Sequence, residues 1–454
     1  MSTTHAREGT TGPAGQDAGL PHVVIVGAGF AGYETARRLT RLARGRARIT
    51  IVNPTDYFLY LPLLPEVATG VLEPRRVTVS LSGTLPGVRM VLGQVDGVDL
   101  DRRVVTYANP EGMSGSLRYD RLVLTVGSVN RLLPIPGVAR YAHGFRDLAE
   151  TLYLRDTLVR QIELADGEPP DEALARTTFV VAGAGYTGTE VAAAGVLFTD
   201  ALARQHPGLG RVRPRWMLLD LADRVLPGLD PRMSREALRV LRSRGVDVRT
   251  GISVAEATED GVRLTDGSFV RTRSLIWCVG VRPDPLVAAL GLDTLGGRLV
   301  VDEYLSVPGH PEVLACGDAA AVPDLTRPGE VTAMTGQHAV RQGKLAAQNI
   351  AASFAGGRKR RYKHHDLGFV VDLGGLDAVA NPLGVALSGV PAKAVTRGYH
   401  LLSIRGNRIR VSSDWVLDAL LRPQAVQTGL VTAAEVPLDD VTAGRAAATR
   451  DQTG

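Results

Sequence analysis

The chain has 454 residues, of which 44% are hydrophobic and 22% charged, a balance typical of a globular protein with two or three domains. Its net charge of +5 comes without a dense run of Lys and Arg, so nothing favours nucleic-acid binding, whereas anionic ligands and anionic membrane surfaces are compatible with it. The two cysteines, Cys278 and Cys316, exclude a disulfide framework and suit a reducing compartment.

The N-terminal segment, residues 1–20, is polar and rich in Gly and Thr, and it lacks the apolar stretch of a secretion signal. We therefore expect a disordered tail there. No run of eighteen apolar residues occurs anywhere, so the sequence predicts no segment that spans a bilayer.

A first strand–loop–helix unit is predicted in HVVIVGAGFAGYETARRL, residues 22–39. Gly27 suits the tight turn, Gly29 lets the backbone approach a pyrophosphate, and Gly32 lets helix and strand pack closely. The helix N-terminus offers free N–H groups to the phosphates. The following strand, RITIVN, ends in Asn53 where an acid is expected, so we predict a neutral and weaker partner for the ribose.

The same pattern returns in TFVVAGAGYTGTEVAAAG, residues 178–195, with Gly183, Gly185 and Gly188 in the equivalent places. Its second strand ends in Asp220, whose carboxylate would bond both ribose hydroxyls and repel a 2′-phosphate, which favours NADH over NADPH. The alternative is that Asp220 is an ordinary turn residue. Two such motifs in the right context predict two dinucleotides.

Three further segments complete the first site in the prediction. RLVLTVGSV (121–129) is an apolar strand that closes in Gly127 and Ser128, and VLACGDAAAV (313–322) ends in Gly317 and Asp318. An Asp at such a strand end can bind a hydroxyl of an extended ligand. A helix over 334–350 follows.

The helix over 334–350 carries Gln337 and Arg341 on one face. We interpret this polar row as directed at a ligand, the alternative being a solvated stripe on a buried helix. Near the C-terminus, Asp414, Asp418 and Arg422 form a polar stripe in Ser413–Arg422, and the remaining positions are apolar. That pattern predicts an amphipathic helix, either on a membrane surface or packed on the domain core.

The succession GAGFAG, LVLTVGS, GAGYTG, IWCVGVRPD and LACGDAA resembles the flavoproteins with two dinucleotide-binding domains, over residues 22–350. The resemblance implies an α/β fold in which a Rossmann-like FAD domain is interrupted by a Rossmann-like NAD domain, followed by a C-terminal α+β domain with an amphipathic helix. The implied boundaries are a tail (1–20), FAD-binding parts (21–150 and 296–355), an NAD(H)-binding domain (151–295), a C-terminal domain (356–435) and a flexible tail (436–454).

By the same resemblance the first unit and the Gly317–Asp318 strand hold FAD, and the second unit holds NADH. The expected cofactor-binding residues are Gly27, Gly29, Phe30, Ala31, Gly32, Asn53, Thr125, Gly127, Gly183, Gly185, Tyr186, Thr187, Gly188, Glu190, Asp220, Gly280, Gly317, Asp318 and Gln337. No metal is expected.

The cysteines narrow the choice within these flavoproteins. Residues 33–75 contain no Cys, which excludes a disulfide reductase with a redox pair after the first helix. Residues 317–454 contain none either, which argues against sulfide:quinone chemistry, although LYLPLLPEVATG (59–70) resembles those enzymes. We expect Cys278 and Cys316 to be core residues.

What remains is most similar to the type II NADH dehydrogenases, the non-pumping NADH:quinone oxidoreductases. The likeness lies in GAGYTGTEVAAAG, in TGQHAVRQG, in RRYKHHDLGFVVDLGG (360–375) and in RGYHLLSIRGNRIRVSSDWVLDALLRP (397–423). It implies hydride transfer from NADH to FAD and two-electron reduction of a quinone, by a protein peripheral on the cytoplasmic face of the cell membrane.

The implied catalytic residues are Glu190, Gln337 and Arg341. Glu190 orients a substrate or relays protons, or else it only complements the helix dipole, as Glu34 would in the first unit. Arg341 stands where the family has Gln, and a homodimer is left open. Two other functions are also left open, a reductase of another acceptor such as a redox protein or soluble quinone, and a flavin-bearing NADH sensor.

Overall fold

The computed structural model describes residues 19–364, 367–421 and 424–438. The expected disordered tail at 1–20 therefore lies almost entirely outside the described residues. The chain forms two compact units. Unit 1 contains 1–58, 80–127 and 283–364, and unit 2 contains 59–79, 128–282 and 365–454. The domain boundaries expected from the sequence remain a prediction.

Unit 1 is built on a six-stranded sheet in which five strands are parallel. In sheet order these are β22 (Ser306–Val307), β23 (His310–Ala315), β9 (Arg121–Leu124), β1 (His22–Val26), β2 (Arg48–Asn53) and β5 (Val88–Leu92), and only β22 is antiparallel to its neighbour. Strand β1 is fully buried, as its run of Val and Ile requires.

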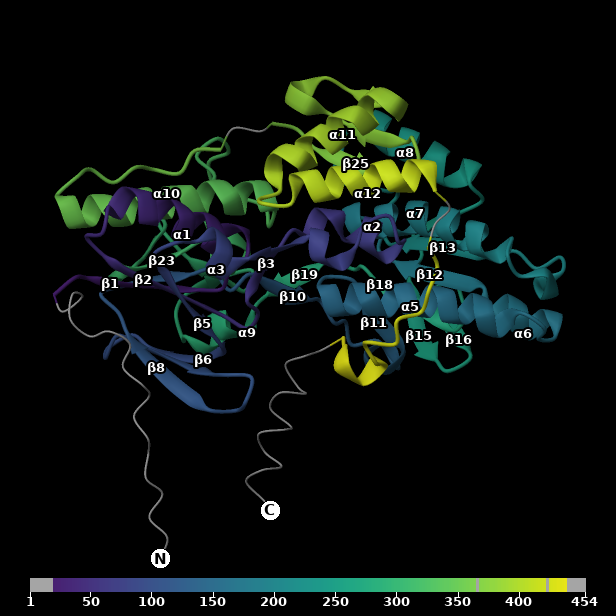
Figure 1. Cartoon of the computed structure of the whole chain (residues 1–454), viewed down its shortest axis with the longest axis horizontal. Coiled ribbons are helices and arrows are strands. Elements are labelled where there is room, and N and C mark those ends of the chain that lie inside the picture. Colours follow the sequence, from purple (N-terminus) through teal and green to yellow (C-terminus); the bar gives the residue numbers. More distant parts are fainter. Residues whose placement is uncertain (1–18, 365–366, 422–423, 439–454) are drawn as a thin grey trace, which may run out of the picture. The chain divides into compact units, whose positions relative to one another are not determined.

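Two helices of unit 1, α1 (Phe30–Ala43) and α10 (Gly336–Ala355), run side by side (Figure 1). A Cβ on Gly343 would stand 2.3 Å from the Ala31 carbonyl oxygen, so glycine permits this close approach. Helix α10 begins two residues after the expected position and continues five residues beyond its expected end.

The rest of unit 1 consists of short elements. They are the antiparallel sheet β6 (Gln94–Asp99), β7 (Val104–Ala108) and β8 (Ser114–Arg118), the small sheet β20 (Thr294–Leu295), β21 (Arg298–Val300) and β24 (Ala320–Ala321), and helices α3 (Leu81–Thr84) and α9 (Pro285–Ala289). Strands β3 (Tyr57–Leu59), β4 (Thr78–Ser80), β10 (Ser128–Asn130) and β19 (Val281–Pro283) lie where the chain passes from one unit to the other.

Unit 2 contains a second parallel sheet, of five strands. In order these are β11 (Ala142–Gly144), β18 (Ser274–Trp277), β12 (Thr178–Ala182), β13 (Arg215–Asp220) and β14 (Asp247–Thr250). Helices α4 (Val138–Tyr141), α5 (Leu148–Ala165), α6 (Pro170–Arg176), α7 (Tyr186–Ala203) and α8 (Pro231–Ser243) and the meander β15 (Val254–Thr258), β16 (Gly261–Leu264) and β17 (Phe269–Arg271) complete the NAD-type fold. Two such sheets confirm the predicted α/β class.

The C-terminal part of unit 2 consists of β25 (Val370–Asp372), β26 (Ala378–Ala380), β27 (Leu387–Ser388), α11 (Gly389–Ser403) and α12 (Arg408–Leu420), with α2 (Leu64–Ala68) from earlier in the chain. Helices α11 and α12 lie together in Figure 1. At the start of the expected flexible tail, Val436 and Leu438 are buried, and Leu438 packs in the core around Trp277. Residues 439–454 lie outside the described part.

Candidate active site

The loop between β1 and α1 has the shape that a bound pyrophosphate requires. Gly27 has φ +91°, and a Cβ there would stand 2.5 Å from the Thr125 carbonyl oxygen. A Cβ on Gly32 would stand 1.9 Å from the Gly27 oxygen, whereas one on Gly29 would meet nothing within 4 Å. The outer glycines are thus required by packing, and the middle one leaves the backbone open to a ligand.

Asn53, at the end of β2, holds this loop through its side-chain amide. Its Oδ1 accepts a hydrogen bond from the Ala28 N–H at 2.7 Å, and its Nδ2 donates to the Thr55 carbonyl oxygen at 2.8 Å. Thr125 supports the loop from β9, because its hydroxyl donates to the Val26 and Gly27 oxygens. Gly127 has φ +76° and open space around it.

The loop between β12 and α7 repeats the geometry in unit 2. A Cβ on Gly183 (φ +101°) would stand 2.3 Å from the Cys278 oxygen, and one on Gly188 would stand 1.9 Å from the Gly183 oxygen. Gly185 and Gly280 have nothing within 4 Å. Tyr186 and Thr187 form the first turn of α7, where N–H groups lack helical acceptors.

Asp220, at the end of β13, bonds its own turn in this structure. Its Oδ2 accepts from the Ala184 N–H at 2.5 Å, and its Oδ1 accepts from the Ala222 N–H at 2.8 Å. These bonds match the alternative reading of a turn residue. They are also compatible with the expected ribose contact, because each carboxylate oxygen can accept a second hydrogen bond. Its ribose role stays a prediction.

The Gly317–Asp318 turn leads toward α10 in unit 1. The Gly317 N–H donates to Gln342 Oε1 at 2.8 Å, and Gln342 Nε2 donates to the Thr332 hydroxyl at 3.0 Å. Thr335 caps α10 by accepting from the His338 N–H. Gln342, which the sequence did not single out as a site residue, therefore ties the turn to the helix.

Arg341 is held by a residue that sequence reasoning missed. Its Nη1 donates to His364 Nδ1 at 2.9 Å, which requires a neutral His364. The His364 ring lies 4.1 Å from that of His338, centre to centre, and His338 Nδ1 is 2.8 Å from the Tyr362 hydroxyl. Burial and the neighbouring His364 lower the pKa of His338 to about 4. Gln337 and Arg341 belong to unit 1 and Glu190 to unit 2.

Glu190 of α7 borders a small cavity in unit 2. Its Oε1 accepts from the Asp372 N–H at 2.9 Å, and burial raises the pKa of its carboxyl well above the usual value. The cavity, of about 60 Å³, is lined by Glu66, Glu190, Asp372, Asp418, Lys393 and Arg397 among others. Both oxygens of Asp372 lie 2.6 Å from Lys393 Nζ. Of this group, the sequence predicted a site role for Glu190, and it placed Asp418 only in the polar stripe of the C-terminal helix.

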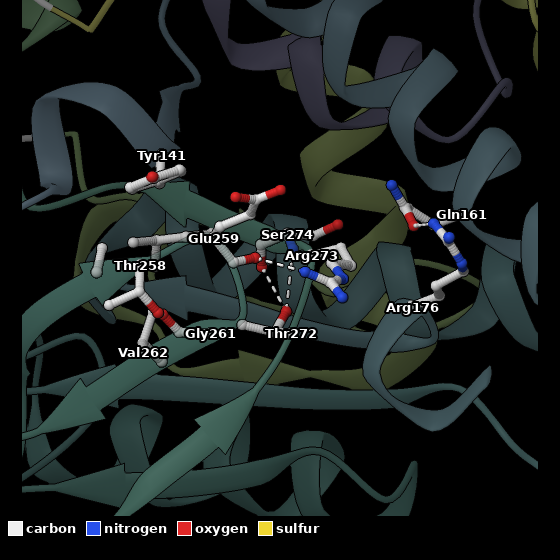
Figure 2. A pocket seen from close by; sticks show the side chains of 12 residues that line it. Tyr141, Gln161, Arg176, Thr258, Glu259, Gly261, Val262, Thr272, Arg273 and Ser274 are labelled. Atoms are coloured by element: carbon white, nitrogen blue, oxygen red, sulfur yellow. Dashed lines mark hydrogen bonds between the residues drawn. The ribbon is translucent and has the colours of Figure 1, made fainter. Parts of the chain in front are cut away.

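A separate polar cavity of about 430 Å³ in unit 2 lies at the amino ends of β18 and β12. Figure 2 shows Gln161 and Arg176 on one side of it and Tyr141 and Thr258 on the other. The glycine loop and Gly280 follow the carboxyl ends of the same strands. Since nucleotides bind at the carboxyl ends of parallel strands, this cavity is not part of the nucleotide site.

The cysteines show no redox arrangement. Both are free, and burial raises the pKa of each thiol to about 12, so neither is a thiolate at neutral pH. Cys278 lies behind the second glycine loop, since a Cβ on Gly188 would stand 3.3 Å from the Cys278 Cβ. Cys316 is buried, which agrees with the expectation of a core residue, and Cys278 is partly buried.

Comparisons with known proteins place these loops in a family. The model of the pyridine nucleotide-disulphide oxidoreductases matches residues 21–343. The chain belongs to that family. Within it, the chain is 29% identical over 431 residues to a type II NADH:quinone oxidoreductase of Mycobacterium tuberculosis, and the match covers 90% of each chain. It is 32% identical over 346 residues to an NADH dehydrogenase-like protein of the same organism, with 73% of this chain and 80% of the relative covered.

Among solved structures of the family, NDH2 from Plasmodium falciparum in complex with NADH matches with a TM-score of 0.82 at 16% identity. The match covers 89% of this chain and 99% of that one, and at this identity it speaks for the fold. The resemblance to type II NADH dehydrogenases predicted from the sequence is thus confirmed by the relatives.

Helix α12 is amphipathic as predicted, but it begins at Arg408, earlier than expected. Polar and apolar residues are found on both its buried and its exposed side. Asp414 is buried and accepts from Arg76 Nε at 2.9 Å, so the acidic stripe packs against the protein. Val416, Leu417 and Leu420 are 57%, 52% and 76% exposed. Val411 and Trp415 are buried, so the helix packs on the domain, as in the alternative, and also exposes other apolar residues. Arg422 lies outside the described residues.

Proposed function

We propose that the protein is an FAD-dependent NADH:quinone oxidoreductase of the type II NADH dehydrogenase kind. The observation that carries the proposal is the pair of glycine loops, each with packed outer glycines and an open middle glycine. A bound FAD supplies the two-electron chemistry that connects NADH oxidation to quinone reduction. The curated relative named above is a quinone reductase, and the chain matches it over nearly its whole length.

Unit 1 would hold FAD and unit 2 would hold NADH. The FAD residues would be Gly27, Gly29, Phe30, Ala31, Gly32, Asn53, Thr125, Gly127, Gly317, Asp318 and Gln337. The NADH residues would be Gly183, Gly185, Tyr186, Thr187, Gly188, Glu190, Asp220 and Gly280. In both units the open N–H groups of the first helical turn receive phosphate, and a strand-end Asn or Asp fixes the loop beside it.

Arg341 would meet the quinone on the acceptor side. A guanidinium can donate to a quinone carbonyl, and its fixed charge favours the reduced product. His364 limits the movement of this side chain through the bond to Nη1. Arg341→Gln restores the residue of the family motif, and we expect the KM for a soluble quinone analogue to change by about tenfold, since a hydrogen bond to a charged group is worth about 1.5–3 kcal/mol.

Association with a membrane would be peripheral and run through α11 and α12. Within the described residues no helix is long and apolar enough to cross a bilayer. Leu402, Leu417 and Leu420 are each more than half exposed on these two helices, which suits insertion at the lipid interface. We assign this docking to the inner face of the cell membrane.

Two measurements test the proposal. Steady-state NADH oxidation with ubiquinone and menaquinone analogues should show quinone-dependent turnover and a preference for NADH over NADPH. Leu417→Ser with Leu420→Ser should reduce binding to anionic liposomes, whereas Leu295→Ser, at a site in unit 1 that is about as exposed as Leu417, should not. Turnover with a redox protein but with no quinone would favour the alternative acceptor instead.

A further inference from the structure

The cavity beside Glu190 is lined by more acidic than basic side chains. Four carboxyl groups line it, from Glu66, Glu190, Asp372 and Asp418, and two cations, Lys393 and Arg397. An ionised carboxylate that is buried without a counter-charge is strongly disfavoured, so it takes up a proton instead. Two of the four carboxyls therefore lack a cationic counterpart and are expected to be protonated.

The contacts indicate which two these are. Asp372 has Lys393 against both of its oxygens, so it is the ionised partner of that cation. Burial raises the pKa of Asp418, and the charge of Arg397, which lies 4.7 Å over the Trp415 ring, is the main effect that opposes this shift. For Glu66 the charge of Arg397 is the smallest of the effects, so we assign Arg397 to Asp418. No cation forms an ion pair with Glu66 or Glu190 among the described residues.

Glu66 is the more deeply buried of the remaining two. It lies on α2, and its Oε2 accepts a hydrogen bond of 2.5 Å from Trp415 Nε1 of α12. Burial, followed by repulsion from Asp372, raises the pKa of Glu66 to about 7. The charged groups around it are Glu190 on α7, Asp372 on β25, Lys393 and Arg397 on α11, and Asp418 on α12.

The cavity itself provides a route between these acids. A water molecule needs roughly 10–15 Å³ measured in this way, so about 60 Å³ accommodates a few waters. Polar carboxyl walls give such waters hydrogen-bond partners. Proton exchange between Glu66 and Glu190 through water is therefore compatible with the geometry.

Quinone reduction requires a proton that NADH does not supply. NADH gives two electrons and one proton as a hydride, and the quinol product carries two electrons and two protons, so one proton per turnover comes from water. We propose that Glu66 and Glu190 together form a two-proton store, and that this store supplies that proton. The carboxyl O–H bond breaks, the proton goes to the reduced acceptor by way of Glu190, and water refills the store through Glu66.

This inference rests on the proposed function, and Glu66→Gln tests it. Gln cannot release the proton but can still accept from Trp415. We expect kcat with a quinone analogue to fall about tenfold near pH 6, where Glu66 of the wild type holds its proton, and little near pH 8, where it is already ionised. A tenfold loss is below the range usual for a direct general acid. Flavin reduction by NADH in a single turnover should be unchanged.

A structural role for Glu66 would give a different result. Asp414→Asn removes the Arg76 ion pair from the same helix, α12, outside the cavity, and should lower stability without altering the pH profile. Glu163→Gln, at an exposed position of the largely buried helix α5, should change neither stability nor the pH profile. Trp415→Phe removes a donor that favours the carboxylate, so the alkaline limb of the profile should move to higher pH. A Glu66→Gln profile parallel to wild type would overturn the proposal.

A readout that needs no quinone separates this inference from the proposed function. Infrared difference spectra at about pH 6, below the pKa of Glu66, should show one protonated carboxyl fewer in Glu66→Gln than in wild type. An unchanged carboxyl count would refute the store even if the enzyme reduces quinones. If wild type reduces no quinone but loses the carboxyl signal on substitution, the proton-holding pair stands and the proposed function fails.

Stability should also respond to pH in a defined direction. The pKa of Glu66 is raised from 4.5 to about 7 on folding, so between these values the folded state binds more protons than the unfolded state. The contribution is fully present below about pH 4.5 and is lost as the pH rises through about 7. Glu66→Gln should remove this part of the pH dependence in denaturant titrations.

Discussion

The two glycine loops have almost the same backbone and differ in the groups around them. In both, the first and third glycines are pressed against a carbonyl oxygen and the middle one is open. The strand-end residue is neutral Asn53 in unit 1 and anionic Asp220 in unit 2. From this comparison we expect the loop shape to specify a dinucleotide and the residues beside it to specify which dinucleotide binds.

The glutamates that follow the two loops, Glu34 and Glu190, also differ in the groups around them. Glu34 is buried on α1 and forms an ion pair of 2.6 Å with Arg37 on its own helix. Glu190, at the equivalent place on α7, accepts from the Asp372 backbone and borders the acidic cavity. Equal positions in the two motifs thus have different partners, and under the proposal above Glu190 is the one that exchanges protons.

The largest effect is expected from a glycine-to-alanine change in each loop, because each change should affect a different cofactor. In Gly32→Ala the new Cβ would meet the Gly27 oxygen at 1.9 Å, and we expect FAD content to fall more than tenfold. Gly188→Ala creates the same clash in unit 2 and should leave FAD bound while abolishing its reduction by NADH. Absorbance of the purified proteins and stopped-flow reduction measure both. Loss of FAD in both variants would contradict the assignment.

A smaller effect is expected from exchanging the strand-end residues. Asp220→Asn gives unit 2 the residue that unit 1 has at this position. We expect kcat/KM for NADH to fall about tenfold, because a hydrogen bond to a charged acceptor is stronger by about 1–2 kcal/mol than one to a neutral acceptor. Discrimination against NADPH should narrow as well. Asn53→Asp serves as the matched control, since it should alter FAD affinity and leave NADH selectivity as it is.

The smallest effect is expected at the cysteines, one behind each site. Turnover should stay within about twofold of wild type in Cys278→Ala and in Cys316→Ala. The free energy of unfolding should fall by roughly 1 kcal/mol in each, as it does in small core truncations. Loss of quinone reduction without loss of flavin would mean that a thiol takes part in the reaction.

The loops were predictable from the sequence because their physical requirement is local. A side chain would clash with backbone that lies within a few residues or on one adjacent strand at Gly27, Gly32 and Gly188. Because these clashes are local, the spacing of the glycines alone identifies the loops. The acidic cavity was not predictable in this way. Glu66, Glu190, Asp372 and Lys393 come from four distant segments, and only the fold brings them together.

Helix α12 shows a second kind of limit. Periodicity identified its polar and apolar stripes correctly, but it cannot say which stripe faces the protein. Asp414 faces inward, where it pairs with Arg76, and apolar Trp415 faces inward beside it, whereas Leu420 faces outward. The contact between Arg341 and His364 was missed for a similar reason, since no sequence pattern connects the two residues.

The central claim is that NADH and a quinone react through the same bound flavin, and double-mixing stopped flow tests it most directly. The enzyme is first reduced with one equivalent of NADH without oxygen and then mixed with a menaquinone or ubiquinone analogue. We predict flavin reoxidation at a rate that rises with quinone concentration and matches kcat. Fast reduction by NADH followed by no reoxidation with any quinone would contradict it.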